Sequence, residues 1–148
     1  NTPALVGEGM AAVSAGTSAS EAEVAHAMDL MTALGKAITV PEAYQDAVTA
    51  ISGSGPAYLF FVVEAMIDAG VLLGLPRDIS SILVSQTIYG SAKLLVESGQ
   101  HPTVLREQVT SPGGTTAAAL RQLEDHKVKA AFLTAIEAAR DRSRALAG

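Results

Sequence analysis

The hydrophobic pattern changes about a quarter of the way along the chain. Residues 1–19 are small and largely apolar, and they indicate a loop with a short strand. Ser20 and Glu23 have the spacing of a capping box, and residues 21–34 then follow the period of an α-helix. A second short apolar run, 37–40, predicts another strand. Two strands are too few for a stable sheet of their own, so this segment indicates part of a larger α/β domain.

The rest of the pattern is helical, with breaks marked by glycine and proline. Serine and glycine at 52–55 mark the first break, and prolines stand where three of the following helices begin. We therefore predict a mainly α fold, in which an all-helical domain, residues 42–148, follows the α/β segment 1–41. The predicted helices cover residues 42–51, 56–73, 76–98, 102–109, 116–124 and 127–147.

The predicted helix 56–73 is apolar around most of its circumference, which requires burial on all sides. A helical domain of roughly a hundred residues does not supply enough neighbours for such a helix, whereas the helices of a second copy do. We therefore predict an intertwined homodimer. Because Glu64 and Asp68 interrupt the apolar stretch, we expect no membrane-spanning segment and no membrane partner.

Composition and charge narrow the classes of function. The 148 residues include no cysteine, which excludes disulfides, thiolate nucleophiles and cysteine-bound metals and favours the reducing cytoplasm. The net charge is −5 and aromatic residues make up only 4%, so we expect no nucleic-acid partner. Residues 1–70 hold eight acidic residues and one basic residue, whereas residues 71–148 hold the other nine basic residues. An anionic substrate therefore fits the second half better.

Two patterns that commonly mark cofactor or metal sites do not fit their context. The stretch Gly7-Glu-Gly-Met-Ala-Ala12 matches the glycine-rich loop of dinucleotide-binding proteins, but Gly16 and its polar neighbours leave too little chain for the helix that must follow. The histidines His26, His101 and His126 are far apart and lack the spacing of metal ligands, so we predict no metal site.

Two turns rich in glycine and hydroxyl residues remain as candidate sites. Residues 52–56 join two helices, and a tight corner with Ser54 as the helix cap accounts for them. Residues 111–116 combine two glycines with an immediate helix start. Free N–H groups and the positive end of the helix dipole there form a site for a carboxylate or a phosphate. The alternative is that Thr115 is an ordinary cap after a glycine hinge, and the residues alone leave both interpretations open.

Three stretches resemble the pyrroline-5-carboxylate reductases, the enzymes of the last step of proline synthesis. They are Asn1-Thr-Pro-Ala4, Ala50-Ile-Ser-Gly-Ser-Gly-Pro-Ala-Tyr58 and Val109-Thr-Ser-Pro-Gly-Gly-Thr-Thr-Ala-Ala-Ala-Leu120, in the order found in that family. The family's nucleotide-binding fingerprint does not occur in the chain. The resemblance therefore implies that residues 1–41 are the tail of a Rossmann-type NAD(P)-binding domain and that residues 42–148 are the dimerisation and substrate-binding domain.

The same resemblance implies roles for individual residues. The substrate is a five-membered cyclic imine whose carboxylate is expected to bind the second turn, and Thr116 matches the threonine whose hydroxyl reaches the ring nitrogen. Gln108 matches a polar position near the nicotinamide of the cofactor. Gly99 stands where some members have a carboxylate, with Glu97 as a substitute. The expected substrate-binding residues are Ser111, Gly113, Gly114, Thr115 and Thr116, of which Thr116 is also the expected catalytic residue.

The resemblance implies the reduction of 1-pyrroline-5-carboxylate to L-proline by NADPH or NADH, with the cofactor bound mainly outside this chain. The expected assembly is a homodimer, alone or as the unit of a larger assembly of dimers. Two alternatives stay open. One is a non-catalytic helical oligomerisation module, in which both turns are only corners. The other is the helical domain of another Rossmann dehydrogenase, although neither Lys36 nor Lys93 has the setting of the catalytic lysine that those enzymes usually use.

Overall fold

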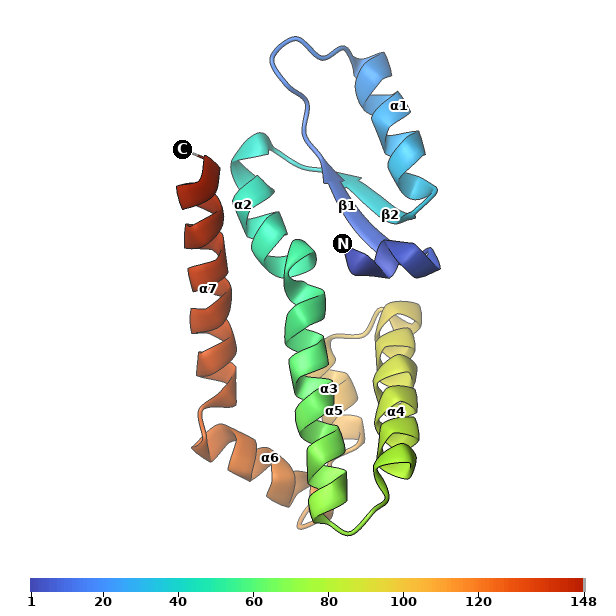
Figure 1. The fold of residues 1–148 in the computed structure, drawn as a ribbon, viewed down its shortest axis with the longest axis vertical. Helices are drawn as coiled ribbons and strands as arrows, with labels where there is room; N and C mark the ends of the chain where they lie inside the picture. Colours follow the sequence, from blue (N-terminus) through green and yellow to red (C-terminus); the bar gives the residue numbers. More distant parts are fainter. Residues whose placement is uncertain (148) are drawn as a thin grey trace. The chain divides into compact units, whose positions relative to one another are not determined.

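The computed structural model describes residues 1–147 and confirms the mainly α fold (Figure 1). Contacts divide the chain into two compact units. One consists of Asn1–Leu59 together with the C-terminal stretch from Phe132, and the other is Phe60–Ala131. The domain boundary predicted at residue 41 separates an α/β segment from a helical one, whereas these two units are defined by contacts. The predicted boundary therefore stays a prediction.

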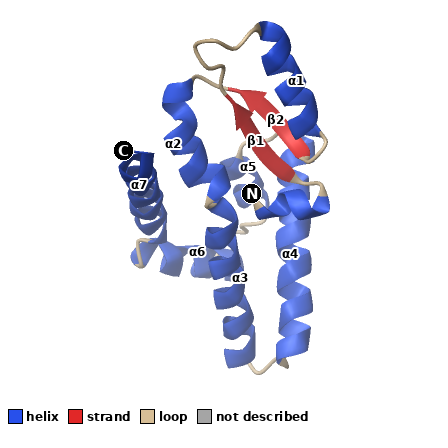
Figure 2. Ribbon diagram, turned by 45° about the horizontal axis from the view of Figure 1, so that its top comes forward, coloured by secondary structure: helices blue, strands red, loops and turns tan. Residues whose placement is uncertain are grey.

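The first unit begins with the predicted strand, helix and strand. A 3-10 helix, Thr2–Val6, leads into β1, Gly9–Val13, and α1, Glu21–Thr32, connects it to β2, Gly35–Thr39. The two strands pair in parallel, with α1 packed on the small sheet (Figure 2). Because β1 starts inside the glycine-rich stretch that begins at Gly7, that stretch forms no dinucleotide-binding loop.

The start of α1 has the predicted capping box. The Ser20 hydroxyl accepts a hydrogen bond from the Glu23 amide at 3.3 Å, and the Glu23 carboxylate accepts one from the Ser20 amide at 2.8 Å. The Ser20 amide, with help from its hydroxyl, holds the pKa of Glu23 below its ordinary value. This cap therefore stabilises the helix above the ordinary pKa of a glutamate and is lost as the pH falls through the lowered one.

The remaining described residues are almost entirely helical (Figure 1). The predicted helix starts near residues 76, 102 and 127 are confirmed to within one or two positions. In chain order the elements are a 3-10 turn, Glu42–Tyr44, then α2, Gln45–Val48, a π-helical turn, Thr49–Gly53, α3, Gly55–Leu72, α4, Arg77–Ser98, α5, Pro102–Gln108, α6, Thr115–Asp125, and α7, Val128–Ala147.

The predicted break and corner at residues 52–55 are wrong. The backbone stays helical there, and the π-helical turn widens it, with the Ser54 amide donating to the Thr49 carbonyl at 2.9 Å. Ser54 itself has helical dihedral angles (φ −84°, ψ −19°) and ends the π-helical turn. Serine and glycine permit a break without forcing one, and the wider turn carries the chain past Pro56, which has no N–H group to donate.

In the second unit, α3 and α4 approach each other closely at one pair of small residues. Ser80 is 1% exposed, and its hydroxyl donates to the Ile67 carbonyl at 2.9 Å. A Cβ atom built on Gly70 would lie 3.0 Å from the Ser80 Cβ and would collide with the Ser80 hydroxyl. Glycine at position 70 therefore sets the distance between these two helices.

This contact predicts that Gly70→Ala lowers the free energy of unfolding by about 1–3 kcal/mol, because the added methyl group overpacks the contact. The matched control is Gly90→Ala in α4, where a Cβ would meet nothing within 4 Å. That change raises the free energy of unfolding by about 0.5–1 kcal/mol through helix propensity alone. Urea denaturation at equal protein concentration checks both values, and equal stabilisation by the two changes would contradict the close contact.

Much of the apolar surface is uncovered in a single copy. Within residues 1–147, the buried apolar side chains are Ala50 and Val84, and none lies in α3, where Phe61 is 73% and Leu72 is 88% exposed. One copy therefore does not provide the burial on all sides that the sequence requires for α3.

Two helical runs, residues 42–72 and 77–98, are long and apolar enough to cross a membrane by length and composition, despite Glu64 and Asp68. Core helices of water-soluble proteins pass the same test. Length and composition alone therefore do not distinguish helices covered by lipid from helices covered by protein.

Candidate functional site

The turn between α5 and α6 depends on two glycines for different reasons. Gly113 has a φ of +68°, a backbone conformation that favours glycine. The Gly114 amide donates to the Ser111 carbonyl at 3.0 Å, and a Cβ atom on Gly114 would collide with the Ser111 hydroxyl. Before the turn, the Thr110 hydroxyl donates to the Arg106 carbonyl at 2.6 Å. The sequence therefore fixes a tight turn directly in front of α6.

The N-terminal end of α6 has no side-chain cap. Gly114 occupies the cap position, and the first hydrogen bond of the helix joins the Ala118 amide to the Gly114 carbonyl at 3.2 Å. The amides of Thr115, Thr116 and Ala117 therefore have no acceptor within the helix. Thr115 is the first residue of the helix, so its interpretation as an ordinary cap is wrong. Three free N–H groups at the positive end of the helix dipole match the requirements of a small anion.

The structure brings the five predicted substrate-binding residues together within this one turn. Gly114 and Thr116 are half-buried, whereas Ser111, Gly113 and Thr115 are exposed. No described residue in the turn carries a charge, so any anion bound here is held by amides, hydroxyls and the helix dipole. The described residues include no group of three or more His, Cys, Asp or Glu side chains that could hold a metal ion.

The other predicted positions have neighbours of their own. Gln108 is exposed at the end of α5, where its amide donates to the side chain of Gln100 at 3.0 Å. Gly99 has a φ of +62° and ends α4 as a left-handed cap. Glu97 is exposed and lies 3.7 Å from the Lys93 ammonium group, one helical turn away. The roles expected for Gln108 and Glu97 stay predictions.

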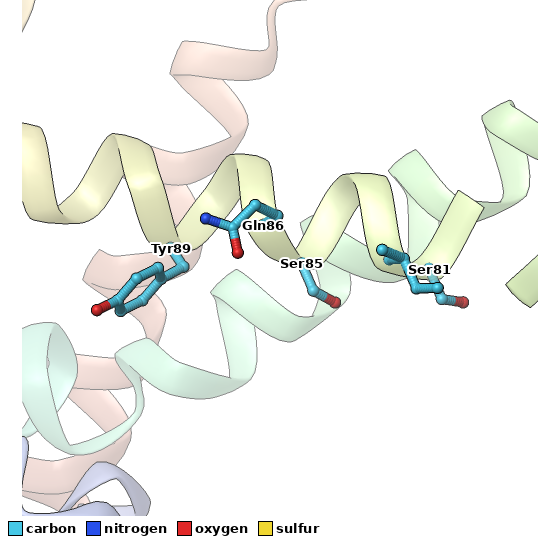
Figure 3. Close-up of a pocket in the computed structure, with 5 residues that line it drawn as sticks. Ser81, Ser85, Gln86 and Tyr89 are labelled. Atoms are coloured by element: carbon cyan, nitrogen blue, oxygen red, sulfur yellow. The ribbon is translucent and has the colours of Figure 1, made fainter. Parts of the chain in front are cut away.

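Sequence reasoning missed a shallow hollow on α4. Figure 3 shows its polar side chains projecting from a single helix. It includes none of the predicted site residues, and it belongs to the uncovered face of α4. Its lining residues are Ser81, Ile82, Ser85, Gln86 and Tyr89.

Comparison with known proteins gives matches over nearly the whole chain. The family model described as pyrroline-5-carboxylate reductase dimerisation matches residues 42–146. The pyrroline-5-carboxylate reductase of Arabidopsis thaliana is 47% identical over 146 residues, which make up 99% of this chain and 53% of the relative. That of Synechocystis is 45% identical over 99% of this chain and 55% of its own length. The chain thus spans about half the length of the curated relatives it matches.

Solved structures agree with these relatives. Pyrroline carboxylate reductase from Plasmodium falciparum, with NADP bound, superposes with a TM-score of 0.94 at 38% identity, over 100% of this chain and 61% of the other. The pyrroline-5-carboxylate reductase from Coxiella burnetii has a TM-score of 0.94 at 37% identity, over 99% and 54%. The resemblance of the three sequence stretches is thereby confirmed. From the match to the family model, the identity to its members and the shared fold, it follows that the chain belongs to the pyrroline-5-carboxylate reductase family.

Proposed function

We propose that this chain supplies the dimerisation and substrate-binding part of an enzyme that reduces 1-pyrroline-5-carboxylate to L-proline with NADPH or NADH. The observation that carries the proposal is the uncapped start of α6 behind the turn 111–116. Its three free amides and the adjacent Ser111 hydroxyl provide a site for the substrate's carboxylate. The partial positive charge at such a helix N-terminus holds an anion without a lysine or an arginine.

Apart from binding the carboxylate, the main task of this chain in the reaction is to position the substrate. A protonated cyclic imine is already electrophilic, so its reduction needs no strong acid or base at the reacting carbon. With the carboxylate on the amides of residues 115–117, the half-buried Thr116 hydroxyl is the group that meets the ring nitrogen. Two fixed points orient the flat ring, and orientation accounts for a large part of catalysis in such a reaction.

Within residues 1–147, the glycine-rich stretch does not form a pyrophosphate site for the cofactor. The stretch Gly7–Ala12 lies partly in β1 and not in a loop before a helix, and the sheet of the described residues has two strands. We therefore assign the nucleotide to the part of the relatives that the chain does not cover. A bound nicotinamide would supply the hydride, and Gln108 is the residue of this chain proposed to lie near it.

A second copy of the chain is the proposed cover of the apolar faces of α3 and α4. Residues 42–146 match a model described as a dimerisation region, and both helices lie in that range. The exposed aromatic and aliphatic side chains then form a core between two copies, as in obligate dimers. A homodimer, alone or as the unit of a larger assembly, explains the apolar composition of α3 and α4 without a membrane. We therefore place the enzyme in the cytoplasm.

Two measurements test the proposed function. The full-length protein is expected to oxidise NADPH or NADH with a rate that saturates in 1-pyrroline-5-carboxylate. A protein of residues 1–148 is expected to scatter light as a dimer, near twice 15.1 kDa, and to oxidise neither cofactor. Oxidation that depends on a hydroxyacid instead of the imine would favour another dehydrogenase, and no oxidation by the full-length protein would favour a non-catalytic module. A mass near 15.1 kDa at micromolar concentration would contradict the dimer.

A further inference from the structure

The side-chain amide of Asn1 bridges two backbone groups that are distant in sequence. Its nitrogen donates to the Ser52 carbonyl at 2.8 Å, and its oxygen accepts from the Met10 amide at 3.2 Å. All three residues belong to the same compact unit. Asn1 thereby joins β1 to the π-helical turn that leads into α3.

The Ser52 carbonyl needs this donor because of a proline. In a helix, the carbonyl of residue 52 would accept from the N–H group of residue 56, but Pro56 has none. The nearby Ala57 amide donates instead to the Ser54 carbonyl at 3.0 Å. The Asn1 amide therefore supplies the hydrogen bond that Pro56 removes from the start of α3.

The Met10 amide needs an acceptor for a different reason. The Gly9 amide donates to the Leu34 carbonyl at 2.8 Å, so Gly9 faces β2. Successive residues of a strand direct their N–H groups to opposite edges, so the Met10 N–H points away from β2. Asn1 thus satisfies an edge group of the sheet with one end of its amide and a helix carbonyl with the other.

A second amide ties the other end of β1 to the same helical run. The Gln45 side chain in α2 donates to the Ala12 carbonyl at 3.3 Å and to the Ser14 hydroxyl at 2.7 Å. The Ser14 hydroxyl in turn donates to the Val40 carbonyl at 2.9 Å. Both ends of β1 are therefore fixed by polar contacts to the helical run that carries the chain from α2 into α3.

We infer that Asn1 is a positioning residue for hydride transfer. It holds the α/β part, which we assign to the cofactor's domain, against the start of α3, a helix of the region that matches the dimerisation model. This inference rests on the proposed function, in which the two parts carry the two reactants. A displacement of about 1 Å between reactants lowers a rate on the order of 100-fold. Asparagine is suited to the task because it combines a donor and an acceptor on one short side chain.

The test compares Asn1→Asp and Asn1→Ala in the full-length enzyme. Aspartate keeps the acceptor for Met10 but removes the donor for Ser52, and alanine removes both. We expect kcat to fall roughly 10- to 100-fold in both variants, with the KM for the imine and the Kd for NADPH changed by less than about twofold. The primary deuterium isotope effect on hydride transfer should rise, because the chemical step becomes slower relative to the others. Thr2→Ala, at the next and exposed position, should leave all values unchanged.

Hydrogen exchange gives a readout that needs no activity. The Met10 amide should exchange roughly tenfold faster in Asn1→Ala but not in Asn1→Asp, which keeps the acceptor. Unchanged exchange at Met10 in Asn1→Ala, or a loss of kcat with no change in the isotope effect, would overturn the inference. A rise in the Kd for NADPH that accounts for the lost activity would also overturn it, since Asn1 would then be a cofactor ligand. An inactive wild-type enzyme would refute the proposed function, while the exchange data would still decide whether Asn1 joins the two elements.

Discussion

The substitution Phe61→Asp on α3 is expected to turn the proposed homodimer into a monomer. Phe61 is 73% exposed in one copy and lies in the region that matches the dimerisation model. Removing a buried phenylalanine costs about 3–5 kcal/mol, and an unpaired carboxylate at the same place adds to that loss. Because every 1.4 kcal/mol is about tenfold in affinity, the Kd of the dimer should rise by roughly a thousandfold or more. Analytical ultracentrifugation at micromolar concentration measures the shift.

A matched control separates the interface from exposure alone. Leu5 is 88% exposed but lies outside residues 42–146, so Leu5→Asp should leave the mass of the dimer unchanged. If Phe61→Asp also stays dimeric with the same Kd, α3 does not form the interface. In that case the uncovered faces of α3 and α4 would require another explanation.

The substitution Thr116→Ala in the full-length enzyme is expected to lower kcat/KM by about 5- to 150-fold. Thr116 is the second residue of α6 and is half-buried, and its hydroxyl is proposed to meet the ring nitrogen of the imine. A hydrogen bond to a charged partner contributes roughly 1–3 kcal/mol, which corresponds to that range of rates. Gly114 already occupies the cap position, so the loss of the hydroxyl should not weaken the helix as the loss of a cap does. Steady-state kinetics and a melting curve of the same variant give the two values.

Two variants control this experiment. Thr116→Ser keeps the hydroxyl and should retain most of the activity. Thr103→Ala removes the threonine at the same second position of α5, and it should change neither activity nor assembly. If Thr116→Ala lowers the melting temperature but keeps its kcat/KM, Thr116 has a structural role and the site assignment is wrong.

Features that depend on a few neighbouring residues could be predicted from the sequence. The capping box of Ser20 and Glu23 forms within one helical turn, and so does the left-handed glycine that ends α4 at Gly99. The start of α5 follows from Pro102, whose fixed φ suits a first helical position. The candidate site belongs to this class, because its residues are contiguous from Ser111 to Thr116. The pattern predicted the turn and its anion-binding character, whereas the role of Thr116 came from the family resemblance.

Features that depend on distant partners could not be predicted in this way. The helical path through residues 52–55 relies on Asn1, 51 positions away, which replaces the donor that Pro56 lacks. The contact of Gly70 with Ser80 requires two helices to meet, and no local pattern encodes that distance. Nor does the sequence distinguish a Thr115 cap from a Gly114 cap, because both residues are acceptable there. Only the geometry showed that the amides at the start of α6 are free.

The most direct test of the account is a titration of the amides at the turn 111–116. A ¹⁵N-labelled protein of residues 1–148, in its dimeric form, is titrated with L-proline and, separately, with pyrrolidine, which is the same ring without the carboxylate. We predict saturable shifts at the amides of Thr115, Thr116 and Ala117 with proline and none with pyrrolidine. Equal responses to the two compounds, or no saturable change at these amides while the dimer stays intact, would contradict the claim that this turn holds the substrate by its carboxylate.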